Sequence, residues 1–256
     1  MSTPTATPTT PAPTPPQLPL FYSRPVPVDA NRHKGKSLRD NPGYAFSARA
    51  NSVPVSGAEF ALVQRHYPIV FTGKDTMVPA AVVGLRADEN LFVRADGTWV
   101  PLTYIPAYVR RYPFVFIEAP GSQLILAIDE GGGFVVDEGK LPLFDDAGKP
   151  TDLVKGALQF CGAYQGNHKA TAEYVAALKA NDLLVDNQAQ ATIAGTERLS
   201  LGGFQIVDEG RFKKLPAATL EEWRDKGWLA WTYAHLLSFA CWNALANLAA
   251  EKKKAA

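Results

Sequence analysis

One short motif occurs twice in this chain, and the duplication constrains the fold more than any other feature. The run His66-Tyr67-Pro68-Ile69-Val70-Phe71 returns as Arg111-Tyr112-Pro113-Phe114-Val115-Phe116. Each copy is followed by two further apolar runs, at residues 81–85 and 91–93 and at residues 124–128 and 134–136. Short apolar runs between turn residues are typical of β-strands. The duplication therefore predicts two similar three-stranded β-units between residues 60 and 145.

Past Pro150 the apolar spacing changes from that of strands to that of helices. Residues 151–184 are expected to form two helices, because Gly162, Gly166 and Asn167 interrupt the pattern, and a single strand near 199–208 is expected to return to the sheet. We therefore predict an α+β fold. Its duplicated three-stranded β-units form a curved mixed or antiparallel sheet or a partial barrel, packed against a C-terminal helical layer.

The chain is expected to divide into a tail and one domain. Residues 1–20 are rich in Pro and Thr, have no positively charged start and no signal-type apolar stretch, and are expected to be a disordered tail. Residues 21–256 are expected to be a single domain with a β-rich half (21–145) and a mostly helical half (151–256). The lack of a signal peptide predicts a cytoplasmic location. Export without such a signal, and membrane association, stay open.

Composition and spacing argue against several classes of protein. The 256 residues carry a formal net charge of +1, whereas a nucleic-acid surface needs a concentrated excess of Lys and Arg, so no nucleic-acid partner is expected. The two cysteines, Cys161 and Cys241, are expected to be reduced and buried. No Cys and His cluster has metal-ligand spacing and no nucleotide-binding fingerprint occurs, so neither a metal nor a cofactor is expected.

Residues 228–250 contain no charged side chain and would be long enough, as a helix, to span a bilayer. Their polar residues and alanines nevertheless favour a buried helix of a globular protein. Trp228, Trp231, His235, Ser238 and Trp242 share one helical face, as core residues do. A peripheral or tail-anchored membrane helix is the alternative.

The best candidate for a functional site lies between the two copies of the motif. Tyr104, Tyr108, Arg110, Arg111 and Tyr112 combine aromatic rings with forked hydrogen-bond donors, as a carboxylate or peptide site does. The alternative interpretation is a connector that its tyrosines hold to the sheet.

Two further groups of side chains could carry chemistry. Acidic pairs follow the predicted strands and are interpreted as turn residues, with a cation or acid–base site as the alternative; they are Asp129-Glu130, Asp137-Glu138 and Asp208-Glu209. An enzyme would need side chains that converge between sheet and helices, for which His66, Asp208 and His235, with the two arginines, are the candidates.

Several of these runs resemble the SapC family. They are Tyr44-Ala45-Phe46, Asn51 to Val55, Glu59-Phe60, the first Tyr-Pro motif, Gly84-Leu85, Asn90 to Val93, residues 104–114 and Gly203 to Asp208. The resemblance covers residues 20–249, and its most specific stretch is 104–114. The family is named for a protein linked to a bacterial surface layer, so the resemblance implies a bacterial accessory protein and supplies no catalytic residue.

We therefore expect a non-catalytic binding or accessory protein of the bacterial cell envelope or surface-layer system, with a protein or peptide partner. An enzyme of unknown reaction, with its site between sheet and helices, is the first alternative. A membrane protein attached through residues 228–250 is the second. A deep polar pocket uniting His66, Asp208 and His235 would favour the enzyme, whereas an exposed Tyr/Arg patch would favour the binding protein. The sequence leaves the ligand and the oligomeric state open.

Overall fold

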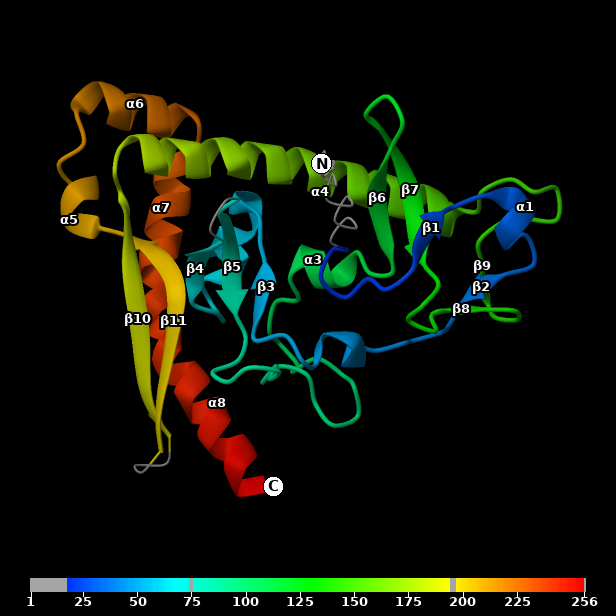
Figure 1. Cartoon of the computed structure of the whole chain (residues 1–256), viewed down its shortest axis with the longest axis horizontal. Coiled ribbons are helices and arrows are strands. Elements are labelled where there is room, and N and C mark those ends of the chain that lie inside the picture. Colours follow the sequence, from blue (N-terminus) through cyan, green and yellow to red (C-terminus); the bar gives the residue numbers. More distant parts are fainter. Residues whose placement is uncertain (1–17, 74–75, 194–196, 256) are drawn as a thin grey trace, which may run out of the picture.

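The computed structural model describes residues 18–73, 76–193 and 197–255 and has an α+β architecture (Figure 1). A five-stranded sheet has the strand order β10-β11-β4-β5-β3, a three-stranded sheet has the order β1-β7-β6, and a small third sheet has the order β8-β2-β9. The long helix α4 runs past both larger sheets, while α7 and α8 lie beside the β10–β11 hairpin (Figure 1). The predicted α+β class is confirmed.

The strands are β1 (Pro25–Pro27), β2 (Ser37–Leu38), β3 (Ser52–Pro54), β4 (Ile69–Thr72), β5 (Val78–Val82), β6 (Phe114–Ala119), β7 (Gln123–Asp129), β8 (Val135–Val136), β9 (Leu141–Pro142), β10 (Leu184–Ile193) and β11 (Glu197–Val207). The α-helices are α1 (Ala30–His33), α2 (Phe60–Val63), α3 (Ala107–Arg110), α4 (Asp152–Ala180), α5 (Glu209–Phe212), α6 (Ala217–Asp225), α7 (Trp228–Leu237) and α8 (Cys241–Ala255). Short 3-10 turns are η1 (Ala45–Ser47), η2 (Gly57–Glu59) and η3 (Ser238–Ala240).

The duplicated motif folds into two equivalent antiparallel units. In the first unit β4 pairs with β5 and β5 with β3, and in the second β6 pairs with β7 and β7 with β1. The backbone register also matches. The N–H of Val82 donates to the carbonyl of Pro68 at 2.9 Å, and the N–H of Asp129 donates to that of Pro113 at 2.9 Å. The two Tyr-Pro motifs therefore precede equivalent strands.

The third strand of each unit has a different origin from the predicted one. It comes from before the hairpin, from Ser52-Val53-Pro54 in one unit and from Pro25-Val26-Pro27 in the other. These segments occupy the outer edges of β5 and β7. The apolar runs at 91–93 and 134–136, which were expected to supply the third strands, therefore cannot pair with those edges. Residues 91–93 form no strand and contribute only the isolated β-bridge from Val93 to Trp99, and residues 135–136 form β8 of the small sheet. The two units consequently stay in separate sheets, and no sheet of the described residues closes into a barrel.

Helix α4 is one continuous helix, so the predicted division into two helices is wrong. One face of α4 is buried along its whole length, at Val154, Cys161, Tyr164, Thr171, Tyr174, Val175 and Leu178. Gly162 and Gly166 lie on the exposed side. Packing of a buried stripe stabilises a helix by more than two exposed glycines destabilise it, which explains why the helix continues.

Alanine at Gly162 and Gly166 is expected to raise the free energy of unfolding by about 0.5–1 kcal/mol at each position. A Cβ atom at either glycine would meet no other atom within 4 Å. Urea denaturation of the double variant measures the effect. Gly57→Ala is the matched control, because its Cβ would overlap the Trp231 ring and the substitution should destabilise the protein. A double variant less stable than the wild type would contradict an exposed, continuous α4.

The helical half differs from expectation in one further element. The predicted strand near 199–208 is β11, and it joins the five-stranded sheet by pairing Phe204 with Thr72 and Gln205 with Phe71. Its partner β10 was not predicted, because most of its side chains are polar or exposed and give no apolar run.

Residues 228–250 belong to α7, η3 and α8 and pack into the main core. Their fully or largely buried side chains are Trp228, Thr232, Ala234, His235, Ser238, Cys241, Leu245 and Ala249. Within the described ranges, no helix combines the length and the apolar character that crossing a membrane requires. Both cysteines are free and buried, as expected.

Candidate binding site at the connector

Residues 104–112, called the connector below, join the two β-units and contain all five residues of the best sequence candidate. The connector begins as irregular chain and turns into α3 after Pro106, which serves as the N-cap. A proline at the start of a helix loses no intrahelical hydrogen bond. Arg111 caps α3, and Tyr112-Pro113 leads directly into β6.

The start of the connector is held by the buried carboxylate of Glu59, which is 6% exposed. Its Oε1 accepts hydrogen bonds from the Tyr104 hydroxyl at 3.0 Å and from the Ala107 N–H at 2.6 Å. Its Oε2 accepts from the N–H and the hydroxyl of Ser56, both at 2.9 Å. Four donors therefore stabilise one carboxylate. Burial and the nearby Glu59 charge raise the pKa of Tyr104 to about 12.

The end of the connector is held by a second buried carboxylate, that of Asp129, which is 0% exposed. Its Oδ2 accepts from the Tyr112 hydroxyl at 2.8 Å and from the Ser23 hydroxyl at 3.4 Å. Its Oδ1 accepts from the N–H groups of Ser23 and Arg24. Asp129 thus joins the connector to the chain entering β1, and it is a buried acceptor rather than the turn residue that the sequence suggested.

Arg110 is exposed, yet its guanidinium is fixed on one side. Its Nε donates to the Ile105 carbonyl at 2.9 Å and its Nη2 donates to the Tyr104 hydroxyl at 3.0 Å. The guanidinium carbon also lies 5.3 Å from the centre of the Phe160 ring of α4. Tyr104, Arg110 and Glu59 therefore form one hydrogen-bonded chain, and the other N–H groups of Arg110 have no acceptor among the described residues.

Arg111 lies within a cluster of tyrosines. Its guanidinium carbon is 4.2 Å from the ring centre of Tyr108, 4.5 Å from that of Tyr164 and 5.6 Å from that of Tyr22. Such cation–π contacts stabilise a partly desolvated cation. The Nε of Arg111 is buried and has no hydrogen-bond partner among the described residues.

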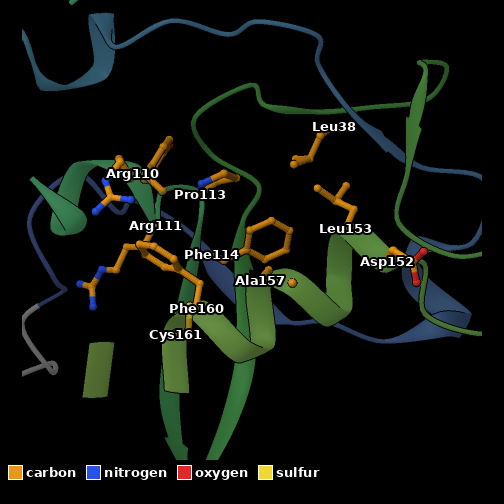
Figure 2. A pocket seen from close by; sticks show the side chains of 12 residues that line it. Leu38, Arg110, Arg111, Pro113, Phe114, Asp152, Leu153, Ala157, Phe160 and Cys161 are labelled. Atoms are coloured by element: carbon orange, nitrogen blue, oxygen red, sulfur yellow. The ribbon is translucent and has the colours of Figure 1, made fainter. Parts of the chain in front are cut away.

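The connector separates two surface grooves. Groove A, of about 390 Å³, lies between the connector and the first turns of α4. Figure 2 shows Arg110 and Arg111 at one end of groove A and Asp152 at the other. The lining between these ends is apolar, from Leu38, Pro113, Phe114, Leu153, Ala157 and Phe160. Cys161 also lines groove A, and burial raises the pKa of its thiol to about 11, so the thiol stays protonated at neutral pH.

Groove B, of about 560 Å³, lies on the other side of the connector. Its lining is more polar and includes Asn41, Tyr44 and Thr98. Arg110 and Tyr112 line both grooves. Of the five predicted residues, Arg110, Arg111 and Tyr112 line the grooves, Arg110 and Tyr112 forming a wall that both grooves share, whereas Tyr104 and Tyr108 line neither. Tyr108 is buried and donates its hydroxyl to the Leu20 carbonyl at 3.1 Å, so its role is to support the segment.

The alternative enzyme residues are not brought together. Among the described residues, no hydrogen bond or ion pair joins His66, Asp208 and His235. Asp208 caps α5 by accepting from the Arg211 N–H, and half-buried His66 contacts the ring of its neighbour Tyr67 edge to face. His235 is 0% exposed, and its Nε2 accepts from the Val207 N–H at 3.0 Å. Nor does any group of three His, Cys, Asp or Glu in the described parts of the chain have a geometry that would hold a metal ion.

His235 is expected to make the protein sensitive to mild acid. Burial lowers its pKa from 6.5 to about 3. Between these values the unfolded chain binds a proton that the folded chain does not, so the free energy of unfolding falls as the pH falls below 6.5. By pH 5 the expected loss is about 2 kcal/mol.

Urea denaturation of wild type and His235→Gln at pH 5 and pH 7 isolates this contribution. The glutamine can accept from the Val207 N–H but does not titrate. The free energy of unfolding of the variant should therefore fall by about 2 kcal/mol less between pH 7 and pH 5 than that of the wild type. Equal losses in the two proteins would contradict the buried neutral histidine.

Comparison with known proteins gives one match. The model of the SapC family matches residues 28–245 of the chain. No curated protein and no solved structure matches it. The matched range includes the first β-unit, the β6–β7 hairpin of the second, the connector, Glu59 and Asp129.

Proposed function

The chain belongs to the SapC family, and from this premise we propose that it is a non-catalytic binding protein whose connector holds a protein or peptide partner of the bacterial cell envelope. The observation that carries the proposal is the wall between grooves A and B, which both include Arg110 and Tyr112. A partner segment that lies over this wall would contact Arg110 and Tyr112 at the centre of the interface. Both residue types are enriched where interfaces gain most of their binding energy.

The rigidity of the connector supports the same function. Buried carboxylates hold it at both ends, Glu59 through Tyr104 and Ala107, and Asp129 through Tyr112. A surface fixed before binding loses little conformational entropy when a partner binds. Arg110 is held in the same way by Tyr104 and Ile105. The proposal therefore gives Tyr104 and Tyr108 a positioning role and Arg110, Arg111 and Tyr112 the contact with the partner.

Charge reversal at the shared wall is expected to abolish partner binding. The full chain is tagged in its own bacterium as wild type, Arg110→Glu and Arg224→Glu, cross-linked in vivo, and purified with quantitative mass spectrometry. Losing a charge-assisted contact and adding repulsion should lower recovery of the true partner at least tenfold in Arg110→Glu. Arg224 is the control because it lies on α6, away from both grooves, and pairs with Glu221 and Asp225.

The comparison between Arg110→Glu and Arg224→Glu decides whether the connector is the partner-binding surface. A cell-envelope protein that is recovered with wild type and Arg224→Glu but not with Arg110→Glu would support the proposal. If every recovered protein responds equally to both substitutions, the connector is not the binding surface.

A further inference from the structure

The two connector arginines form a pair of cations that lacks an anion. Arg110 lies over Phe160 and Arg111 over Tyr164, and these rings are one turn apart on α4. Equivalent atoms one helical turn apart are about 5–6 Å apart. Among the residues that the structure describes, neither arginine forms an ion pair with a carboxylate. The two cations thus lie against neighbouring rings of one helix, and an anion that contacts both would be attracted by each.

The pair is suited to a carboxylate. A guanidinium presents parallel N–H donors that match the two oxygens of a carboxylate, and such pairs are among the strongest hydrogen bonds in proteins. Arg110 keeps free N–H groups after bonding Ile105 and Tyr104. Arg111 has a buried Nε without an acceptor among the described residues.

Groove A begins at the same arginines, has an apolar middle and ends at Asp152 (Figure 2). Its volume of about 390 Å³ falls in the range of small-ligand sites. A ligand that fits must therefore carry a carboxylate and an apolar group close together. The last residue of a peptide does so, because its carboxylate and its side chain are attached to the same Cα atom. An internal acidic residue does not, since neighbouring side chains of an extended peptide point to opposite faces.

Groove B indicates a peptide rather than a simple amphiphile. It shares Arg110 and Tyr112 with groove A, and its lining includes the polar residues Asn41, Tyr44 and Thr98. The backbone of residues before the last one needs such groups as hydrogen-bond partners. A hydrocarbon tail would use groove A alone.

From these observations we infer that the connector recognises the free C-terminus of a partner protein. The terminal carboxylate binds between Arg110 and Arg111, the apolar last side chain occupies groove A, and the preceding residues cross into groove B. This inference rests on the proposed function, because it names the part of the partner that the proposed site holds.

A matched peptide library tests the inference with the full chain. N-acetylated hexapeptides randomised at their last three positions are synthesised once with a free C-terminal carboxylate and once as C-terminal amides, and dissociation constants of the selected sequences are measured. Free acids with an apolar last residue should bind at least tenfold more tightly than their amides. Arg111→Lys keeps the charge over the tyrosine rings but loses the forked donor. Arg111→Lys and Arg110→Gln should each reduce the preference for free acids over amides to less than threefold. The control Arg224→Gln should preserve the tenfold preference.

The outcomes separate the inference from the proposed function. Equal binding of acids and amides, weakened by Arg110→Gln, would overturn C-terminal recognition and leave the connector as a peptide site. Equal binding that neither connector variant changes, or binding of no peptide at all, would overturn the inference. In that case the recovery of a whole-protein partner by wild type and not by Arg110→Glu still decides the proposed function. Tighter binding of a free fatty acid than of any peptide would assign groove A to an amphiphile and overturn the inference as well.

Discussion

Asp129→Ala is expected to lower the free energy of unfolding by about 3–5 kcal/mol, because each buried donor left without an acceptor costs about 1–3 kcal/mol. The substitution removes the acceptor of four donors at a site that is 0% exposed. The chain entering β1 would lose its attachment to β7 through Ser23 and Arg24, and Tyr112 would lose its only side-chain hydrogen bond among the described residues. Urea denaturation measures the change.

Asp129→Asn is the matched variant and should cost only about 1 kcal/mol. The backbone N–H groups of Ser23 and Arg24 both donate to Oδ1, which an amide oxygen can replace. Oδ2 accepts from two hydroxyls, of Ser23 and Tyr112, and a hydroxyl can instead accept from the new amide NH₂. If alanine and asparagine destabilise the protein equally, the hydrogen bonds of Asp129 do not explain its role.

Glu59→Ala is expected to cost a similar amount, about 3–5 kcal/mol, since it too leaves four donors without an acceptor. Its amide variant, however, should behave differently from that of Asp129. Each oxygen of Glu59 accepts from one backbone N–H, Ser56 on Oε2 and Ala107 on Oε1. Whichever oxygen is replaced by NH₂ in Glu59→Gln, that group faces a backbone N–H. A backbone N–H can only donate, so it would be left without an acceptor.

Glu59→Gln should consequently cost about 2–3 kcal/mol, clearly more than Asp129→Asn. It should also weaken partner binding, because Tyr104 and Arg110 lose the carboxylate that fixes them. Denaturation and binding measured on the same preparations separate the two effects. An order of stability in which Glu59→Gln is milder than Asp129→Asn would contradict the hydrogen-bond pattern described above.

Much of the fold follows from local sequence patterns. The repeated Tyr-Pro motif correctly predicts two equivalent β-units, because a strand and its following turn are encoded by neighbouring residues. The edge strands were missed because Pro25–Pro27 and Ser52–Pro54 lie far from their partners in sequence and contain too few residues for a strand pattern. The continuity of α4 was missed for a related reason. Gly162 and Gly166 lower helix propensity locally, whereas the burial that outweighs them depends on both sheets.

The candidate site likewise combines residues that local sequence identifies with residues that only the fold brings to it. The aromatic and guanidinium groups of the connector are adjacent in sequence, so they could be selected before the fold was known. Glu59 and Asp129 could not, since they reach Tyr104 and Tyr112 across 45 and 17 residues. One signal was present at Glu59, because Ser56 and Glu59 have the spacing of a capping box, which the structure contains. Asp129 carried no such signal, as an aspartate after a strand is ordinary in turns.

The central claim is that a partner lies over the wall between grooves A and B, and site-specific photo-crosslinking in the native organism tests it most directly. A photoreactive phenylalanine analogue is placed in the full chain at Thr98, an exposed residue that lines groove B, or at Glu221 on α6. We predict that one partner is cross-linked from position 98, that Arg110→Glu abolishes this product, and that position 221 does not produce it. Cross-linking of the same partner from position 221 but not from position 98 would contradict the claim.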